Sequence, residues 1–381
     1  TVREVAPSAY RVRGLSGLAR LGDRVRLGDG VDATLGEIVR VDEAGATVKP
    51  FNGRAAVGIG MPARMIGAMR LSPAPSWKGR VINALGEPVD GGGPLVRGER
   101  AMPTDAQPPP AMTRQRIHKG LRTGVRVIDL FTPFCEGQRI GIFAGSGVGK
   151  STLLSMIARS SGFDTVVVAL VGERGREVRE FLEGPLAANL SRAVVVVATG
   201  DESPMMRRLA LPSATAIAEY FRDRGESVLL IADSVTRYAH AARDVALAAG
   251  EPAVARGYAP SVFSDLPRLL ERAGPGGKGG GAITGIFAVL VDGDDHNDPV
   301  ADAIRGTLDG HVVLDRAIAD QGRYPAVNVL GSISRLADVV WTAEQRELVR
   351  RLRTMIARFE DTRDLRLMGG YHPGTDIDLD H

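Results

Sequence analysis

The chain has 381 residues, a length that indicates two or three domains and allows a sizeable core to be buried without disulfide bridges. Hydrophobic residues make up 44% of the composition and charged residues 24%, which excludes an intrinsically disordered or fibrous protein. A single cysteine, Cys135, excludes an internal disulfide. The sequence also lacks a paired Cys/His ligand set, so it excludes a structural zinc site and favours a reducing compartment.

Neither a membrane span nor a secretion signal is expected. No apolar run approaches the roughly 18 residues that a spanning helix needs, and the first residues hold no apolar signal region. The charge is uneven, since residues 1–80 carry 13 Lys and Arg against 7 Asp and Glu. This basic surplus suits an acidic protein partner, nucleic acid or anionic lipid, and a solvated surface on an arginine-rich protein explains it equally well.

The first part of the chain, residues 1–75, is predicted to be a small β-barrel domain. Short β-type runs separated by Gly and Asp turns are typical of an antiparallel barrel. The runs lie at residues 23–27, 35–41 and 46–50. Residues 72–76 contain two prolines and are predicted to be a linker, because proline fixes φ and removes a hydrogen-bond donor. A second domain is expected to begin near Trp77.

The second part, residues 76–338, is predicted to be an α/β nucleotide domain. Apolar runs alternate with helical stretches, as in βα units that build a parallel sheet wrapped by helices. The predicted buried strands are residues 139–143, 165–171, 193–199, 228–233 and 285–291. The glycine-rich stretch 274–281 has too little side chain to pack, and we expect it to be a mobile loop.

The last part, residues 339–381, is predicted to be a helical domain. Thr342 and Gln345 have the spacing of a capping box, and apolar residues then recur at helical spacing. We interpret this stripe as core packing rather than as a binding surface. It consists of Leu348, Leu352, Ile356 and Phe359.

A phosphate-binding loop is the strongest local signal. The stretch from Ala144 to Ser151 reads AGSGVGKS and lies between a predicted buried strand and an apolar helix. Glycines let backbone amides converge on phosphate oxygens, the helix N-terminus adds positive potential, a lysine reaches the outer phosphates and a serine can ligate magnesium. The strict pattern has glycine where Ala144 stands. The predicted nucleotide-binding residues are Gly145, Ser146, Gly147, Val148, Gly149, Lys150, Ser151 and Thr152.

Two acidic residues at strand ends are candidates for hydrolytic chemistry. Asp233 ends the apolar run from Val228, where the carboxyl end of a buried strand would hold it near a nucleotide as a magnesium ligand. A helix-capping aspartate is the alternative. Glu173 follows the run that ends at Val171 and could polarise an attacking water. The alternative for Glu173 is a merely solvated carboxylate.

Several motifs resemble the catalytic subunits of rotary ATP synthases and their relatives. Within that superfamily the chain is similar to the type III protein-export ATPases, and His296 with the pair Arg305-Gly306 favours the flagellar branch. The likeness covers nearly the whole chain. The motifs are residues 79–91, 172–177, 201–204, 233–237, 292–299, 308–311, 325–328 and 332–335.

The resemblance implies roles for individual residues. Lys150 and Ser151 match the residues that bind phosphates and Mg²⁺, Asp233 the magnesium-holding carboxylate, and Glu173 the water-activating carboxylate of ATP hydrolysis. Three arginines match residues near the γ-phosphate: Arg174, Arg237 and Arg335, the last as a finger that reaches a neighbouring subunit's nucleotide. Tyr324 matches the aromatic residue that stacks on adenine. A surface ion pair for Arg335 and a plain core tyrosine for Tyr324 are the alternatives.

The resemblance also implies partners and a place in the cell. Family members work as homohexamers, bind ATP and Mg²⁺, and contact a stator-like regulator, a central stalk protein, an export gate and chaperone–cargo complexes. They are cytoplasmic and peripheral at the inner membrane. Members usually have a further N-terminal segment and a longer C-terminal helical domain. Much of both is expected to be absent here, so that nucleotide chemistry could persist while assembly or partner binding is impaired.

The sequence therefore predicts a RecA-like, P-loop ATPase of the flagellar export apparatus with a parallel sheet, an N-terminal β-barrel and a truncated helical domain. An injectisome ATPase would share the catalytic residues and differ in its partners. An RNA-translocating hexamer could use the basic N-terminal region, but no aromatic residues interleave there and we expect no nucleic acid partner. A nucleotide-binding subunit without turnover is the non-enzyme alternative, against which Glu173 argues.

Overall fold

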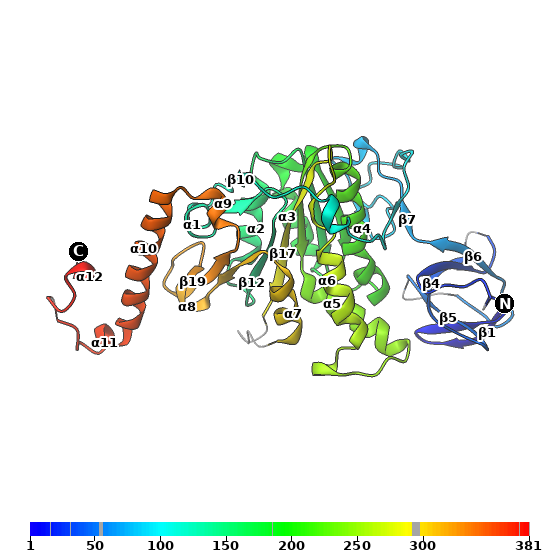
Figure 1. Ribbon diagram of the computed structural model, residues 1–381. Helices are drawn as coiled ribbons and strands as arrows, with labels where there is room; N and C mark the ends of the chain where they lie inside the picture. The colour runs from blue at the N-terminus through cyan, green and yellow to red at the C-terminus, as the bar shows by residue number, and fades with distance from the viewer. Residues whose placement is uncertain are drawn as a thin grey trace.

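The computed structural model describes residues 1–15, 17–30, 32–52, 56–184, 186–291, 298–372 and 374–380. The chain forms an antiparallel β-unit at its N-terminal end, a central sheet covered by helices, and a helical end at the C-terminus (Figure 1). The motif residues 292–297, which include His296, lie outside the described residues.

The N-terminal unit is a six-stranded antiparallel sheet that closes on itself. Its strand order is β1-β2-β5-β4-β3-β6. The backbone of Val2 exchanges hydrogen bonds of 2.9 Å with Met61 and Gly60, which precede β6 and so join the first strand to the last. The predicted barrel is therefore confirmed. Its strands are β1 (Val2–Ala6), β2 (Ala9–Val12), β3 (Asp23–Leu27), β4 (Thr34–Asp42), β5 (Gly45–Pro50) and β6 (Ala63–Ala68).

The central sheet has nine strands. Its order is β19-β18-β12-β17-β15-β13-β14-β8, with β16 pairing β17; all neighbours from β18 to β8 are parallel, and β19 is antiparallel. The five predicted buried runs are confirmed as β12, β13, β14, β15 and β17. The strands are β8 (Val81–Asn83), β12 (Arg139–Ala144), β13 (Thr165–Val171), β14 (Ala193–Ala198), β15 (Ser227–Asp233), β16 (Gly274–Pro275), β17 (Ala282–Leu290), β18 (Gly310–Leu314) and β19 (Val327–Ser334).

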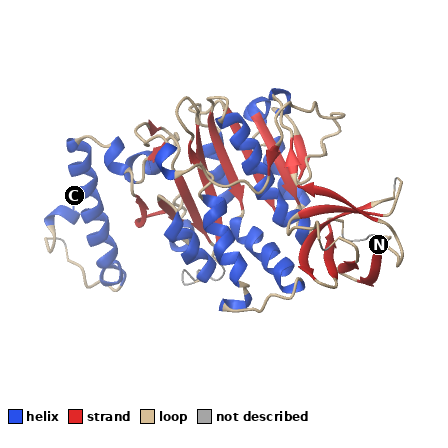
Figure 2. Ribbon diagram, turned by 45° about the vertical axis from the view of Figure 1, so that its right-hand side comes forward, coloured by secondary structure: helices blue, strands red, loops and turns tan. Residues whose placement is uncertain are grey.

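Helices cover both faces of this sheet (Figure 2). Alternate residues of β13 belong to two different core clusters, one on each face of the sheet, so every residue of that strand is buried. Strands buried on both faces are continuous apolar runs in the sequence. One cluster includes α4 (Pro204–Arg222), α5 (Val235–Ala248), α6 (Pro260–Leu270) and α7 (Pro299–Thr307). The other includes α1 (Arg126–Phe131), α2 (Lys150–Ala158), α3 (Gly175–Glu183) and α8 (Arg316–Asp320).

The segment between β6 and β12 also forms two separate two-stranded sheets. In the predicted linker, Ala74 is buried, and Trp77 follows it into the same core cluster. The Trp77 indole nitrogen also donates a hydrogen bond of 2.7 Å to the Val96 carbonyl. The linker is thus packed against the nucleotide domain. The paired elements are β7 (Arg70–Leu71) with β9 (Met102–Pro103) and β10 (Gly120–Leu121) with β11 (Phe134–Cys135).

The glycine-rich stretch 274–281 differs from the predicted free loop. It begins with β16, which pairs β17, and the N–H of Gly281 donates a hydrogen bond of 2.8 Å to the Arg222 carbonyl. A Cβ on Gly281 would lie 1.9 Å from the Glu226 carbonyl oxygen. Glycine is therefore required here for close backbone packing.

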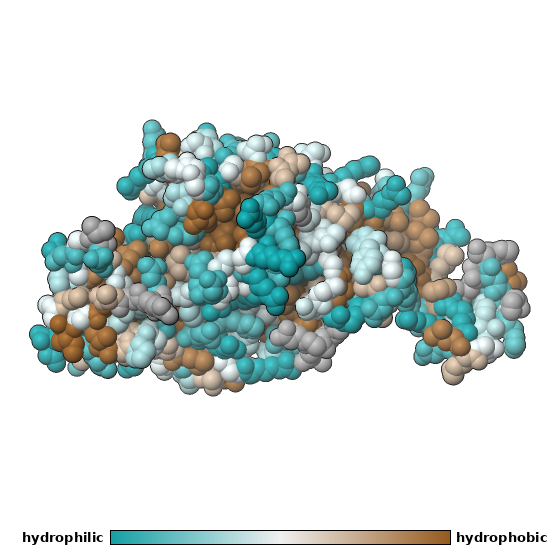
Figure 3. All heavy atoms as spheres, turned by 180° about the vertical axis from the view of Figure 1, so that it is seen from behind, coloured by the Kyte–Doolittle hydropathy of each residue, from teal (hydrophilic) through white to brown (hydrophobic). Residues whose placement is uncertain are grey.

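The C-terminal helices stand at the far end of the molecule from the barrel (Figure 1). The capping box of Thr342 and Gln345 is confirmed. The predicted core stripe is wrong for Leu348 and Phe359, which are 51% and 47% exposed, because α10 buries only Val349 fully. Apolar side chains are visible at this end from behind (Figure 3). The helices are α9 (Ala337–Val340), α10 (Ala343–Asp361), α11 (Arg363–Leu367) and α12 (Ile377–Asp380). None of the described helices is both long and apolar enough to cross a membrane.

Candidate functional site: a phosphate-binding cavity at the carboxyl edge of the sheet

The predicted phosphate loop connects β12 to α2. Gly147 and Gly149 have φ values of +78° and +98°, a left-handed conformation that side chains rarely adopt, so these glycines allow the loop to turn back on itself. Gly149 directly precedes the first residue of α2, Lys150. The loop therefore presents backbone amides and the positive end of a helix to one space.

Asp233 lies opposite the loop. It is the last residue of β15, is buried, and forms an ion pair with the Lys150 ammonium group. β15 and β12 both neighbour β17, so their carboxyl ends lie at the same edge of the sheet. The cap of α5 is Ser234, whose hydroxyl accepts a hydrogen bond of 3.3 Å from the Arg237 N–H. The helix-capping alternative for Asp233 is therefore wrong.

Glu173 follows β13 and points into the same space. Only 9% of it is exposed, so the solvated alternative is wrong. Burial, a hydrogen bond to Glu177 and the charge of Asp233, in that order, together raise the pKa of Glu173 to about 7, against the opposing charges of Lys150 and Arg237. The Arg237 Nε lies 3.5 Å from a Glu173 carboxylate oxygen. The same hydrogen bond lowers the pKa of Glu177.

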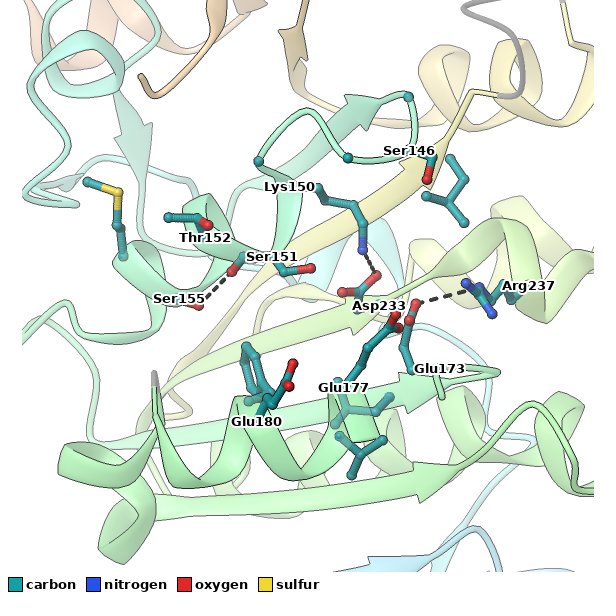
Figure 4. A pocket seen from close by; sticks show the side chains of 18 of the residues that line it. Ser146, Lys150, Ser151, Thr152, Ser155, Glu173, Glu177, Glu180, Asp233 and Arg237 are labelled. Atoms are coloured by element: carbon teal, nitrogen blue, oxygen red, sulfur yellow. Dashed lines mark hydrogen bonds and ion pairs between the residues drawn. The ribbon is translucent and has the colours of Figure 1, made fainter. Parts of the chain in front are cut away.

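These residues enclose a cavity of about 720 Å³. In Figure 4, Lys150 extends from the loop to Asp233, Glu173 and Glu177 lie beyond Asp233, and Arg237 reaches in from α5. Part of the lining was not predicted from the sequence. Glu177 ends the motif of residues 172–177, four residues after Glu173, a helical spacing that could have signalled it. The unpredicted lining residues are Ser155, Met156, Arg159, Leu170, Glu177, Val178, Glu180, Phe181 and Leu290.

Some predicted site residues lie outside the lining. Val148 is buried beneath the loop, and Arg174 is exposed at the N-cap of α3. Tyr324 is 67% exposed, which rules out a core tyrosine, and its ring lies beside the loop, since a Cβ on Gly149 would be 3.8 Å from two ring carbons.

Arg335 is placed at the opposite edge of the sheet. Ser334, which precedes it, pairs Gly310 at the start of β18, and Gly310 pairs Ile140 near the start of β12. The phosphate loop follows the other end of β12. Arg335 is exposed there and is not brought together with Lys150 in its own chain.

The oxygen atoms of the cavity fit a magnesium ion that accompanies a nucleotide. Mg²⁺ is usually bound through one or two protein oxygens together with phosphates and water. In Figure 4 the Ser151 hydroxyl and the Asp233 carboxylate face the same space below the loop. Asp233 is buried beside a lysine that could turn to a phosphate, which would leave its carboxylate available.

Comparison with known proteins agrees with this geometry. The family described as ATP synthase alpha/beta, nucleotide-binding domain, matches residues 124–334, more than half of the chain. The chain belongs to the ATP synthase alpha/beta family. The family described as T3SS EscN ATPase C-terminal domain matches residues 341–381 of this family member.

The predicted likeness to flagellar relatives is confirmed for this member of the ATP synthase alpha/beta family. The "Flagellum-specific ATP synthase" of Rhizobium meliloti is 59% identical, and the match covers 100% of this chain and 81% of the relative. The solved structure of the assembled type III secretion ATPase EscN from enteropathogenic E. coli is 40% identical, with a TM-score of 0.91 over 100% of this chain and 91% of that chain. The structure of EscN in complex with its central stalk EscO has a TM-score of 0.89 at 40% identity, with the same coverage.

Proposed function

We propose that this chain is the ATPase of the flagellar type III protein-export apparatus, which hydrolyses ATP to ADP and phosphate to energise the unloading and export of flagellar proteins. The proposal of ATP hydrolysis rests on one observation. The phosphate loop, Asp233 and Glu173 come from three different strand ends and meet in one cavity. The flagellar assignment is supported by 59% identity to a flagellum-specific relative, against 46% and 44% to two type 3 secretion system ATPases.

The cavity suggests how each residue contributes to hydrolysis. The loop amides and Lys150 would hold the β- and γ-phosphates, and Ser151 and Asp233 would hold Mg²⁺, whose chemistry would be to neutralise charge on the phosphate oxygens. Lys150 exchanges its contact with Asp233 for the phosphates when nucleotide enters. Binding therefore separates the two partners of a buried ion pair and gives each a new one.

Glu173 is the residue that orients and deprotonates the attacking water. Its pKa of about 7 suits a base that must accept a proton near neutral pH and release it afterwards. Arg237 lies 3.5 Å from Glu173 and stabilises the anion. Arg237 also donates a hydrogen bond to the Gly172 carbonyl, so it holds the segment that carries Glu173. Arg174, exposed next to Glu173, would approach the γ-phosphate only if its side chain turned inward.

The active form is a homohexamer in which Arg335 of one subunit completes the cavity of the next. This proposal is supported by the distance along the sheet between Arg335 and its own phosphate loop, and by the assembled state named for EscN. Tyr324, exposed beside Gly149, would stack on adenine.

Partners and location follow from the flagellar role. We infer a central stalk protein, as named for EscN, together with a stator-like regulator, an export gate and chaperone–cargo complexes. The chain would act in the cytoplasm, peripherally at the inner face of the membrane.

Two measurements test this function. Purified protein should hydrolyse ATP only with Mg²⁺, and Lys150→Ala should abolish turnover whereas Lys119→Ala, an exposed lysine paired with Glu136, should not. In a strain that lacks its flagellar ATPase, the full-length wild-type gene should restore motility and the Lys150→Ala gene should not. Turnover without restored motility, combined with restored injectisome secretion in a matching strain, would refute the flagellar assignment.

A further inference from the structure

A side chain far along the sequence touches the phosphate loop. The Arg316 guanidinium, at the first residue of α8, donates a hydrogen bond of 2.9 Å to the carbonyl oxygen of Ser146. Ser146 lines the cavity and Arg316 does not. The contact therefore reaches the loop from outside the cavity, and it joins α8, which follows β18, to the turn that follows β12.

The backbone that carries Arg316 is held firmly. Asp315 caps α8 by accepting a hydrogen bond of 2.8 Å from the Ala317 N–H. Its other carboxylate oxygen accepts one of 3.0 Å from the Asn328 side chain, and its own N–H donates to the Ala326 carbonyl at 2.9 Å. Asp315 is thus tied to β19 and to the helix at once. Arg316 starts from a fixed point, so its contact with the loop is preorganised.

Peptide geometry gives this contact a consequence for nucleotide binding. In a planar trans peptide the C=O and the following N–H point in opposite directions. The Ser146 carbonyl faces Arg316, so the N–H of Gly147 faces away from it, and Gly147 lines the cavity. Gly147 has φ of +78°, and apart from its chain neighbours no atom lies within 4 Å of its Cβ position, so the space beside this residue is open.

We propose that Arg316 is a positioning residue for nucleotide binding: by holding the Ser146 carbonyl outside the cavity, it keeps the Gly147 N–H turned toward the phosphates. This inference rests on the proposed ATPase function. Arg316 acts through the loop and not by touching the nucleotide. Its loss should weaken the binding of ATP while leaving the chemical step, which depends on Glu173, largely intact.

The same segment touches the loop at a second point. Tyr324, eight residues after Arg316, lies beside Gly149 at the other end of the loop. The segment from α8 to Tyr324 therefore approaches the loop at both Ser146 and Gly149.

The test compares Arg316→Gln and Arg316→Lys with the control Arg323→Gln. Arg323 is an exposed arginine of the same segment whose side chain contacts Gln321 at 3.4 Å rather than the loop. Binding of Mg·ATP is measured by calorimetry, and KM and kcat by phosphate release. The loss of a charge-assisted hydrogen bond should lower the affinity of Arg316→Gln about tenfold and raise KM by the same factor.

The remaining readouts separate positioning from folding. The kcat of Arg316→Gln at saturating ATP should stay within about twofold of the wild type, because only binding changes. Arg316→Lys should recover most of the affinity, since an ammonium group can still donate to one carbonyl. Unfolding temperatures of all variants should match because Arg316 is exposed.

Equal affinity in Arg316→Gln and Arg323→Gln, or a loss of kcat with unchanged affinity, would overturn the positioning role. Wild-type protein that fails to bind or hydrolyse ATP would instead refute the proposed function. The two failures are therefore distinguishable.

Discussion

The two edges of the central sheet are built differently. At the carboxyl edge, Lys150, Asp233, Glu173 and Arg237 meet around one cavity, and two of these four side chains are linked there in a buried ion pair. At the amino edge, Arg335 is exposed. Antiparallel β19 carries the chain back from one edge to the other. The comparison shows that the chain gathers the cavity-lining charged groups at one edge of the sheet and leaves Arg335 exposed at the other.

Removing the outward-facing arginine is expected to have the largest effect. Arg335→Ala should lower ATP turnover by about 10³-fold, because an arginine finger neutralises charge that develops during phosphoryl transfer. Binding of Mg·ATP by the isolated chain should remain unchanged, since Arg335 does not line its own cavity. Phosphate release is measured across a wide range of protein concentrations. For the wild type, turnover per protomer should rise with concentration.

Mixing two inactive variants sharpens this prediction. The Arg335→Ala variant keeps an intact phosphate loop, and the Lys150→Ala variant keeps Arg335. An interface between one copy of each can therefore contain both an intact loop and Arg335. Equimolar mixtures should regain turnover that neither variant has alone. Arg346→Ala, which removes an exposed arginine paired with Asp338, is the matched control and should hydrolyse ATP normally. A flat rate that Arg335→Ala leaves unaltered would rule out a shared site.

Within the cavity, substitution of the buried carboxylate is expected to have the next largest effect on ATP turnover. Glu173→Gln should lower turnover about 10²-fold or more, because the amide cannot accept the proton of the attacking water. Mg·ATP binding should persist, and the unfolding temperature should not fall, since burial disfavours the ionised form of Glu173. Phosphate release measures the loss of turnover, and a calorimetric titration with Mg·ATP measures the retained binding. Full activity in Glu173→Gln would show that a group other than Glu173 activates the attacking water.

The pH dependence of ATP turnover tests the protonation state of Glu173. The pKa of Glu173 is raised to about 7, chiefly by burial, and the ionised form is the active one, so turnover should increase as pH rises through 7. Below that pH, turnover should fall by about tenfold per unit.

Glu177→Gln provides the control for the profile. The hydrogen bond between the two carboxyl groups raises the pKa of Glu173, so its removal should move the midpoint to lower pH. A midpoint that stays in place in Glu177→Gln would show that the titrating group is not Glu173.

Much of the carboxyl edge could be predicted from the sequence because its determinants are local. Strands buried on both faces must be continuous apolar runs, and the residue that follows each run lies at the edge where the phosphate loop is. Glu173 and Asp233 were placed by this rule. The contact between Arg316 and Ser146 could not be predicted, since 170 residues separate its partners and no local pattern records it. The stripe on α10 was misread because helical spacing shows that a helix is amphipathic, but not what covers it.

The smallest expected effect lies at the amino edge and should change stability alone. Asp309 accepts three hydrogen bonds of 3.0 Å from the backbone and guanidinium of Arg139, and its carbonyl accepts the Arg335 N–H. Asp309→Asn should lower the free energy of unfolding by about 1–3 kcal/mol, because the partly buried guanidinium loses charge-assisted bonds. Denaturant melts against Asp338→Asn, an exposed aspartate, measure this loss.

Mg·ATP affinity of Asp309→Asn should equal that of the wild type, since the cavity lies at the other end of β12. If affinity fell while stability did not, the amino edge would be transmitting its state along the strands to the phosphate loop. The carboxyl edge and the amino edge would then not be independent, because a change at the amino edge would alter nucleotide binding at the carboxyl edge.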